Sequence, residues 1–400
     1  MSAQPPTEQS TAPQTSLNLG SVLQKMLAVS DKVSDLIFSP GRPPQIELVG
    51  KLQGVDIPGL DKLTPPQTAA IAKIIIGAHE EAAQSLEKYG SADLSFSVPS
   101  LCRFRVNIFK QRGTHAIVMR VIPTRPPNFA DFNLPPQMRD IVELKNGIVL
   151  VTGPTGSGKS STLAAVIDLI NETKYYHIVT IEDPIEFLHA HKSSTIHQRE
   201  LHSDTPNFAL ALRAALRQAP KVILVGEMRD RETMEVALEA AETGHLVLST
   251  LHTIDAAKTV ERIIGVFPKN EEQIIRTRLA QSFRYIVSQR LMPRADGSGR
   301  VAAMEILKAT SRTREYIERG ESEGKSLMDA MEQGDMEGMQ TFDGEIEKMI
   351  RAGTVSREDG LAYSSNYGNL LLRLADFGAG GGAKKEPEPA VPSMLDMIEP

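Results

Sequence analysis

A glycine-rich run in the middle of the chain has the residue types and spacing of a phosphate-binding loop. Residues 153–160 read Gly-Pro-Thr-Gly-Ser-Gly-Lys-Ser, which fits the pattern G-x-x-x-x-G-K-S. Glycines let backbone N–H groups approach phosphate oxygens that side chains would otherwise keep away. In this pattern the lysine reaches the outer phosphates of a nucleoside triphosphate, and the serine hydroxyl, here that of Ser160, ligates Mg²⁺. We assign to the nucleotide Gly153, Pro154, Thr155, Gly156, Ser157, Gly158, Lys159, Ser160 and Ser161.

A carboxylate that follows an apolar run is the candidate for activating water. Residues 222–226 read Val-Ile-Leu-Val-Gly and precede Glu227, as in a Walker B strand that ends beside a phosphate loop. Hydrolysis needs a group that orients or deprotonates the attacking water, and we assign this role to Glu227. The alternative is a solvated glutamate after a strand. Gly226 stands where such strands usually carry an aspartate, so another acid would ligate the metal.

Further acids follow a second apolar run. Residues 180–186 read Thr-Ile-Glu-Asp-Pro-Ile-Glu, and three carboxylates this close repel one another unless a cation or arginines share the space. We therefore expect them to contact Mg²⁺, directly or through water, with Asp183 assigned to the metal and Glu182 and Glu186 to catalysis. Each could instead cap a helix or be a solvated charge.

A histidine ends a further apolar run. Residues 248–253 read Leu-Ser-Thr-Leu-His-Thr, and His252 could hydrogen-bond the γ-phosphate. A histidine at a strand end can also be structural. Two arginines, Arg105 and Arg120, alternate with apolar residues near the N-terminus, and by spacing alone such arginines are usually solvated surface.

Positioning these groups requires a sheet whose strands all end at one edge. Alternating strand and helix patterns from about Met138 predict a mostly parallel sheet covered by helices, and ligands bind such sheets at the carboxyl ends of the strands. The strand candidates are 147–152, 177–181, 221–225 and 245–250, with helices such as 207–218 and 232–243 between them. Residues from Asn270 onward are predicted to be mainly helical.

The N-terminal part shows a different, α+β pattern. We expect a helix over 22–29, a strand pair around Gly50, helical structure over 66–88, and strands at 93–98, 102–110 and 115–122. The predicted domain organisation is a disordered end (1–16), an α+β domain (17–123), a proline-rich linker (124–137), an α/β nucleotide-binding domain with a helical last part (138–375) and a flexible tail (376–400).

Composition narrows the function classes. The 400 residues suffice for two domains, and 41% hydrophobic with 24% charged residues is typical of a globular protein. A net charge of -6 favours no nucleic-acid partner. The single cysteine excludes an intramolecular disulfide and a multi-cysteine zinc site. Without a secretory signal or an apolar run of about 18 residues, we expect a cytoplasmic protein that does not insert into the membrane.

These elements, in this order, resemble the secretion ATPase superfamily and, within it, the twitching-motility ATPases of type IV pili (PilT and PilU). The resemblance covers about 17–370, nearly all of the predicted folded chain. Beyond the phosphate loop, it rests on the acidic box 180–186, Gln-Arg-Glu at 198–200, 211–217, 223–230, 240–245, the histidine box 251–253 and 338–343.

The resemblance implies an ATPase that couples hydrolysis of Mg²⁺-bound ATP to mechanical work, as a homo-hexamer that powers pilus retraction. Each subunit would have a PAS-like N-terminal domain and a RecA-like C-terminal domain with ATP between them, and Arg105 and Arg120 would face the γ-phosphate as arginine fingers. It also implies peripheral attachment at the inner membrane through a pilus platform protein, and possible pairing with a paralogous pilus ATPase.

Two segments depart from the family pattern and keep alternatives open. Ile37 stands where relatives often carry histidine, and 312–316 reads Arg-Thr-Arg-Glu-Tyr where retraction ATPases carry Ala-Ile-Arg-Asn-Leu. An accessory, nucleotide-gated ring subunit with weak hydrolysis is one alternative. An assembly ATPase of pili or type II secretion is another, although those proteins usually carry a four-cysteine zinc module.

Overall fold

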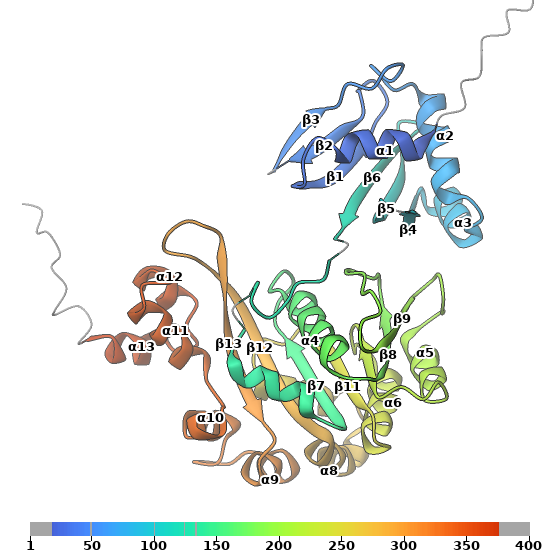
Figure 1. Cartoon of the computed structure of the whole chain (residues 1–400). Helices are drawn as coiled ribbons and strands as arrows, with labels where there is room; N and C mark the ends of the chain where they lie inside the picture. The colour runs from blue at the N-terminus through green and yellow to red at the C-terminus, as the bar shows by residue number, and fades with distance from the viewer. Residues whose placement is uncertain (1–17, 49, 100, 124, 133, 376–400) are drawn as a thin grey trace, which may run out of the picture. The chain divides into compact units, whose positions relative to one another are not determined.

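An antiparallel sheet organises the first part of the chain (Figure 1). In the computed structural model, which describes residues 18–375 apart from 49, 100, 124 and 133, its strand order is β3-β2-β1-β6-β5-β4. The strands are β1 (Val33–Phe38), β2 (Gln45–Leu48), β3 (Lys51–Gly54), β4 (Ser91–Val98), β5 (Cys102–Gln111) and β6 (Thr114–Ile122). Along β5, Phe104, Val106 and Ile108 are buried while Arg105 is exposed, as the alternation of side chains across a strand requires.

Three helices complete the core of this part: α1 (Leu19–Leu27), α2 (Pro65–Ile76) and α3 (Glu80–Tyr89). Leu23, Met26 and Ile71 pack with the sheet residues in one apolar cluster. The strand pair and the three later strands confirm the predictions. The predicted helical stretch 66–88 is two helices, because Gly77 ends α2 at a positive φ of 51°. Strand β1 was not predicted.

A seven-stranded sheet organises the rest, in the order β13-β12-β7-β11-β10-β8-β9. Its strands are β7 (Gly147–Thr152), β8 (His177–Glu182), β9 (Thr195–Glu200), β10 (Val222–Val225), β11 (Leu246–Leu251), β12 (Phe283–Pro293) and β13 (Arg300–Lys308). Strands β11 and β12 run parallel to β7, and β10 and β9 run parallel to β8. Strands β7, β10 and β11 are buried along their whole length, as in a sheet covered on both faces.

The parallel sheet and its four predicted strands are confirmed to within one residue. The expectation that residues beyond Asn270 are mainly helical was wrong for 283–308, where β12 pairs with β7 and with β13. The run Tyr285-Ile286-Val287 is buried and partly β-branched, which favours a strand. Strand β9 was also missed.

Helices connect these strands and form the C-terminal part. They are α4 (Lys159–Thr173), α5 (Phe208–Ala215), α6 (Arg231–Glu242), α7 (Ala256–Gly265), α8 (Glu272–Ser282), α9 (Ser311–Arg319), α10 (Leu327–Glu332), α11 (Phe342–Arg351), α12 (Arg357–Ala362) and α13 (Tyr367–Arg373), with short 3-10 turns at Pro136–Glu143, Lys269–Glu271 and Asp335–Glu337. No helix in the described part of the chain is long and apolar enough to cross a membrane.

By internal contacts the chain divides into two compact units. The first unit combines Met1–Asn128 with Ile167–Gly226, and the second combines Phe129–Val166 with Glu227–Pro400. The domain boundaries at 17–123 and 138–375 remain a prediction. The predicted disordered end 1–16 and tail 376–400 lie outside the described residues.

Candidate active site

The glycine loop joins β7 to α4 in a conformation that only glycine adopts easily. Gly153, Gly156 and Gly158 have φ values of 146°, 79° and 88°. A Cβ on Gly153 would lie 2.5 Å from the backbone oxygen of Gln289, and one on Gly158 would lie 2.8 Å from the Nε2 atom of the same residue. The loop is therefore both conformationally demanding and tightly supported from β12.

The groups that would meet a phosphate gather on this loop. The Lys159 side chain is buried, and its Nζ donates to the carbonyl oxygens of Gly153 (2.9 Å) and Pro154 (3.1 Å). The Ser157 hydroxyl is buried and has no hydrogen-bond partner in the described structure. Ser160 and Ser161 lie half-buried in the first turn of α4. A buried cation and an unpartnered hydroxyl beside a helix N-terminus fit a bound phosphate group.

Gln289, on β12, holds this loop in place and was missed from the sequence. Its Nε2 donates to the Ser157 carbonyl (2.6 Å), and its Oε1 accepts from the Thr162 hydroxyl (2.8 Å), both in buried surroundings. On the preceding residue, the Ser288 hydroxyl accepts from Thr152 at the end of β7 (3.1 Å). No local signal marks Gln289, since its role depends on β12 pairing with β7, which lies more than a hundred residues earlier.

Glu227 lies two residues after the end of β10, and Arg229 and His252 are its neighbours. Its Oε1 atom is 2.7 Å from Arg229 Nε and 3.3 Å from His252 Nε2. Burial raises the pKa of the Glu227 carboxyl, but the hydrogen bonds and charges of Arg229 and His252 outweigh burial and hold the pKa below its usual range. The carboxylate is thus ionised at neutral pH and can accept a hydrogen bond from water. The roles assigned to Glu227 and His252 remain predictions, but the structure does bring the two side chains together.

The acidic box lies in the first unit. Glu182, at the end of β8, accepts hydrogen bonds from Thr180 Oγ1 (2.6 Å) and Gln198 Nε2 (3.1 Å). Burial raises its pKa to about 7 although these hydrogen bonds oppose the shift. Asp183 and Glu186 are exposed. The described residues contain no group of three or more potential metal-ligating side chains, so the assignment of Asp183 to Mg²⁺ stays a prediction.

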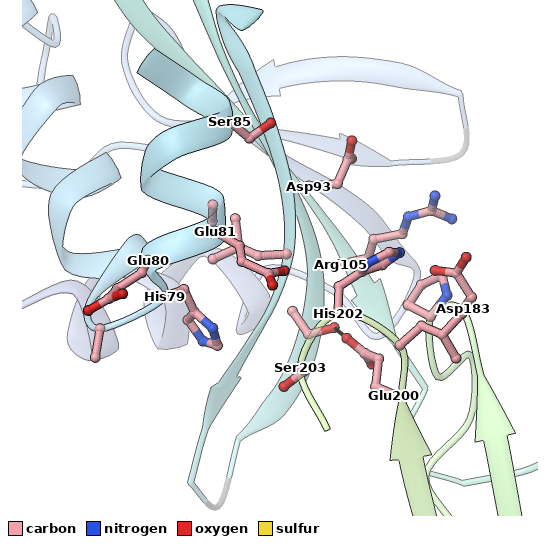
Figure 2. Close-up of a pocket in the computed structure, with 16 residues that line it drawn as sticks. His79, Glu80, Glu81, Ser85, Asp93, Arg105, Asp183, Glu200, His202 and Ser203 are labelled. Atoms are coloured by element: carbon pink, nitrogen blue, oxygen red, sulfur yellow. Dashed lines mark hydrogen bonds between the residues drawn. The ribbon is translucent and has the colours of Figure 1, made fainter. Parts of the chain in front are cut away.

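The two predicted arginine fingers are neighbours on the antiparallel sheet. Arg105 on β5 lies opposite Arg120 on β6, and Arg120 Nε donates to Asp35 Oδ1 at 3.0 Å. Arg105 and Asp183 line the same pocket of about 570 Å³ within the first unit, as Figure 2 shows. The structure therefore brings together two of the predicted site residues. Contact of Arg105 and Arg120 with a γ-phosphate remains a prediction.

A buried carboxylate in the first unit ties the acidic box to the antiparallel sheet. Glu200, at the end of β9, accepts from Arg103 Nη2 (2.7 Å), from Ser95 Oγ (2.5 Å) and from the backbone N–H of Ile185 (3.1 Å). From the sequence, Glu200 had no predicted role beyond its place in the motif 198–200. No local signal marked Glu200, because β9 was not predicted and the polar run 197–200 gives no sign that its last residue is buried and paired.

Fold and site together define an α/β protein with a phosphate loop and an ionised carboxylate at the carboxyl ends of parallel strands. The sequence profile of the Type II/IV secretion system protein family matches residues 90–359, and the chain belongs to this family. The chain is 43% identical over 339 residues to the type IV pilus retraction ATPase PilT of Pseudomonas aeruginosa, with 84% of this chain and 96% of PilT covered.

Two further proteins are similar over most of the chain. The type IV pilus ATPase PilU of Pseudomonas aeruginosa is 36% identical over 349 residues, which cover 87% of this chain and 89% of PilU. A crystal structure of the pilus retraction motor PilT with bound ADP matches with a TM-score of 0.79 and 40% identity, and it covers 89% of this chain and 99% of that one. These similarities confirm the family resemblance and the predicted fold class.

Proposed function

We propose that this chain is a cytoplasmic ATPase that powers retraction of type IV pili as a homo-hexameric ring. The phosphate loop, with its buried lysine and unpartnered Ser157 hydroxyl, is the observation that carries the proposal. The similarity to PilT, which extends over nearly the whole of that protein, supports a role in pilus retraction. Because the identity to PilU is lower, an accessory role in the ring is the second candidate function.

Lys159, Glu227 and the metal ligands would perform the hydrolysis. Lys159 would leave its loop carbonyls and neutralise the outer phosphates of ATP. Glu227, kept ionised by Arg229 and His252, would orient the attacking water and take its proton. Ser160 and Asp183 would hold Mg²⁺, which supplies charge neutralisation when bound.

The remaining predicted site residues would act on the reacting phosphate and on the metal. We propose that Arg105 and Arg120 meet the charge that develops on the γ-phosphate, as arginine fingers do. Arg120 would then leave its ion pair with Asp35 and bind the phosphate instead. Glu182 and Glu186 would contact the hydrated metal.

The partners follow from the family. The ring would dock peripherally at the inner membrane on a platform protein of the pilus machine, and a paralogous pilus ATPase would be a second partner. This placement needs no membrane insertion and no nucleic acid.

Two substitutions test the enzymatic part. Lys159→Ala should abolish binding of a fluorescent ADP analogue, because Lys159 is the one cationic residue within the loop 153–160 and would neutralise the phosphates. Glu227→Gln should keep binding but release phosphate at least about 100-fold more slowly, since general-base contributions are of this size. Lys269→Ala and Glu235→Gln, both on the surface, are the matched controls. Phosphate release by Glu227→Gln at the parent rate would refute the assignment of the base.

Deletion of the gene tests the cellular part. Cells that keep abundant surface pili but cannot twitch would support retraction. Cells without pili would point to an assembly ATPase. A purified parent protein that binds nucleotide and releases no phosphate would point to a nucleotide-gated ring.

A further inference from the structure

A buried carboxylate in the second unit has no role in the site described so far. Glu305, on β13, is 0% exposed. Its Oε1 accepts the backbone N–H of Ala256 at 2.8 Å, while its Oε2 is shielded from water and has no hydrogen-bond partner in the described part of the chain. A buried carboxylate with an unpartnered oxygen is costly, and ordinary packing does not require one.

One oxygen of Glu305 binds the start of α7, which follows the histidine box in the chain. Ala256 is the first residue of α7, and the turn before it carries His252, whose Nε2 lies 3.3 Å from Glu227 Oε1. Helix α7 already has an N-cap, because the Asp255 side chain accepts the backbone N–H of Lys258 at 2.7 Å. Asp255 and Glu305 therefore accept different N–H groups of the first turn of α7, and the second oxygen of Glu305 serves neither of them.

The other side of Glu305 meets the support of the phosphate loop. Glu305 pairs across the sheet with Ser288 on β12. The Ser288 hydroxyl accepts from Thr152, the last residue of β7, and the next residue along β12 is Gln289, which holds the loop. Glu305 thus lies between the turn that carries His252 and the strand that supports the phosphate loop.

Its surroundings leave Glu305 able to change charge near neutral pH. Burial raises its pKa to about 7, and the charge of Asp255 at the start of α7 raises it further. The Ala256 N–H, the nearby Ser288 hydroxyl and the charge of Arg290 on β12 lower it, although the Ser288 hydroxyl does not meet the geometry of a hydrogen bond to Oε2. Arg290 also interacts with the charge of Asp343 on α11, so its guanidinium does not act on Glu305 alone. An ionised carboxylate accepts a stronger hydrogen bond than a neutral carboxyl or amide does.

We propose that Glu305 is a positioning residue for nucleotide hydrolysis, which in its ionised form fixes the turn carrying His252 against the support of the phosphate loop. The inference rests on the proposed function. Glu305 acts through the Ala256 backbone and the Glu227–His252 pair and does not itself touch the nucleotide.

Glu305→Gln separates positioning from structure, because the amide keeps the shape and the acceptor for Ala256 but cannot ionise. The folded-state pKa of the parent lies above the 4.5 of an ordinary glutamate, so the folded parent holds a proton that the unfolded chain releases as pH rises from 4.5 to about 7. Glu182 and Glu345, whose pKa values are also raised by burial, lower the stability of both proteins as pH rises, so the stability of the parent falls more steeply over this window than that of the variant. At pH 8 the variant should melt at a higher temperature than the parent.

The same variant should hydrolyse more slowly although it is more stable. We expect kcat at pH 8 to fall about fivefold, the difference between a charged and a neutral acceptor, with KM for ATP changed less than about twofold. The ratio of parent to variant kcat should shrink towards pH 6, where the parent is protonated. Glu345→Gln is the matched control, since burial also raises the pKa of Glu345, on α11, outside the contacts described above.

Three results would overturn the inference. An unchanged kcat at pH 8 would exclude positioning, and a lower melting temperature at pH 8 would make Glu305 a structural residue. A parent-to-variant ratio that does not depend on pH would exclude a role for its charge. Failure of the parent to release phosphate would instead overturn the proposed function, and the inference with it.

Discussion

Replacing Gln289 should make the phosphate loop less ordered without changing any residue that is assigned to nucleotide binding. Gln289→Leu keeps most of the side-chain volume and removes both polar atoms. It leaves the Ser157 carbonyl and the Thr162 hydroxyl, which the Gln289 amide now satisfies at 2.6 and 2.8 Å, without these partners in buried surroundings.

The cost follows from those two groups. Each buried polar group left unpaired costs about 1–3 kcal/mol, so the pair costs about 2–6 kcal/mol. Thr162 can turn its hydroxyl to a carbonyl of the preceding helical turn, which recovers part of this, and we expect the free energy of unfolding to fall by about 2–4 kcal/mol. If about 1.4 kcal/mol of this free energy is the cost of ordering the loop again when ADP binds, ADP should bind about tenfold more weakly.

Denaturant unfolding and titration with a fluorescent ADP analogue measure the two effects. Gln289→Glu is the sharper variant: it keeps the acceptor for Thr162 but sets a carboxylate oxygen against the Ser157 carbonyl, so ADP affinity should fall further than in Gln289→Leu. The exposed Gln281→Ala is the control. Native ADP affinity in Gln289→Leu, with or without a loss of stability, would show that this side chain does not shape the loop.

Two further predictions follow from close contacts. Gly158→Ala should weaken ADP binding more than Gly156→Ala does, because both have a positive φ but only a Cβ on Gly158 meets Gln289; equal effects measured by titration would contradict this. Arg103→Met should lower the free energy of unfolding by about 3 kcal/mol, because it strands a buried carboxylate, and adding Glu200→Gln should recover most of the loss; denaturant unfolding in which the double variant is no more stable than the single one would refute the pairing.

The site was predictable where its chemistry is local. The phosphate loop combines glycines at positive φ with a lysine and a serine within eight residues, and all of these constraints act between neighbours in the chain. Glu227 was found in the same way, as a carboxylate shortly after a buried strand. The direction of its pKa shift was not predictable, because it depends on whether Arg229 and His252 together outweigh burial, and His252 reaches Glu227 from the end of a different strand.

By itself, the sequence determined the identity of the phosphate loop, the alternation of strands and helices around it and the family. These features are set by side-chain periodicity and by backbone preferences, which act over a few residues. Only the tertiary structure decided that β12 lies beside β7, and with it the placement of Gln289 against the phosphate loop and of Glu305 in the buried sheet. Strand pairing and burial are set by which distant segments exclude water together, and that information is absent from any local window of the chain.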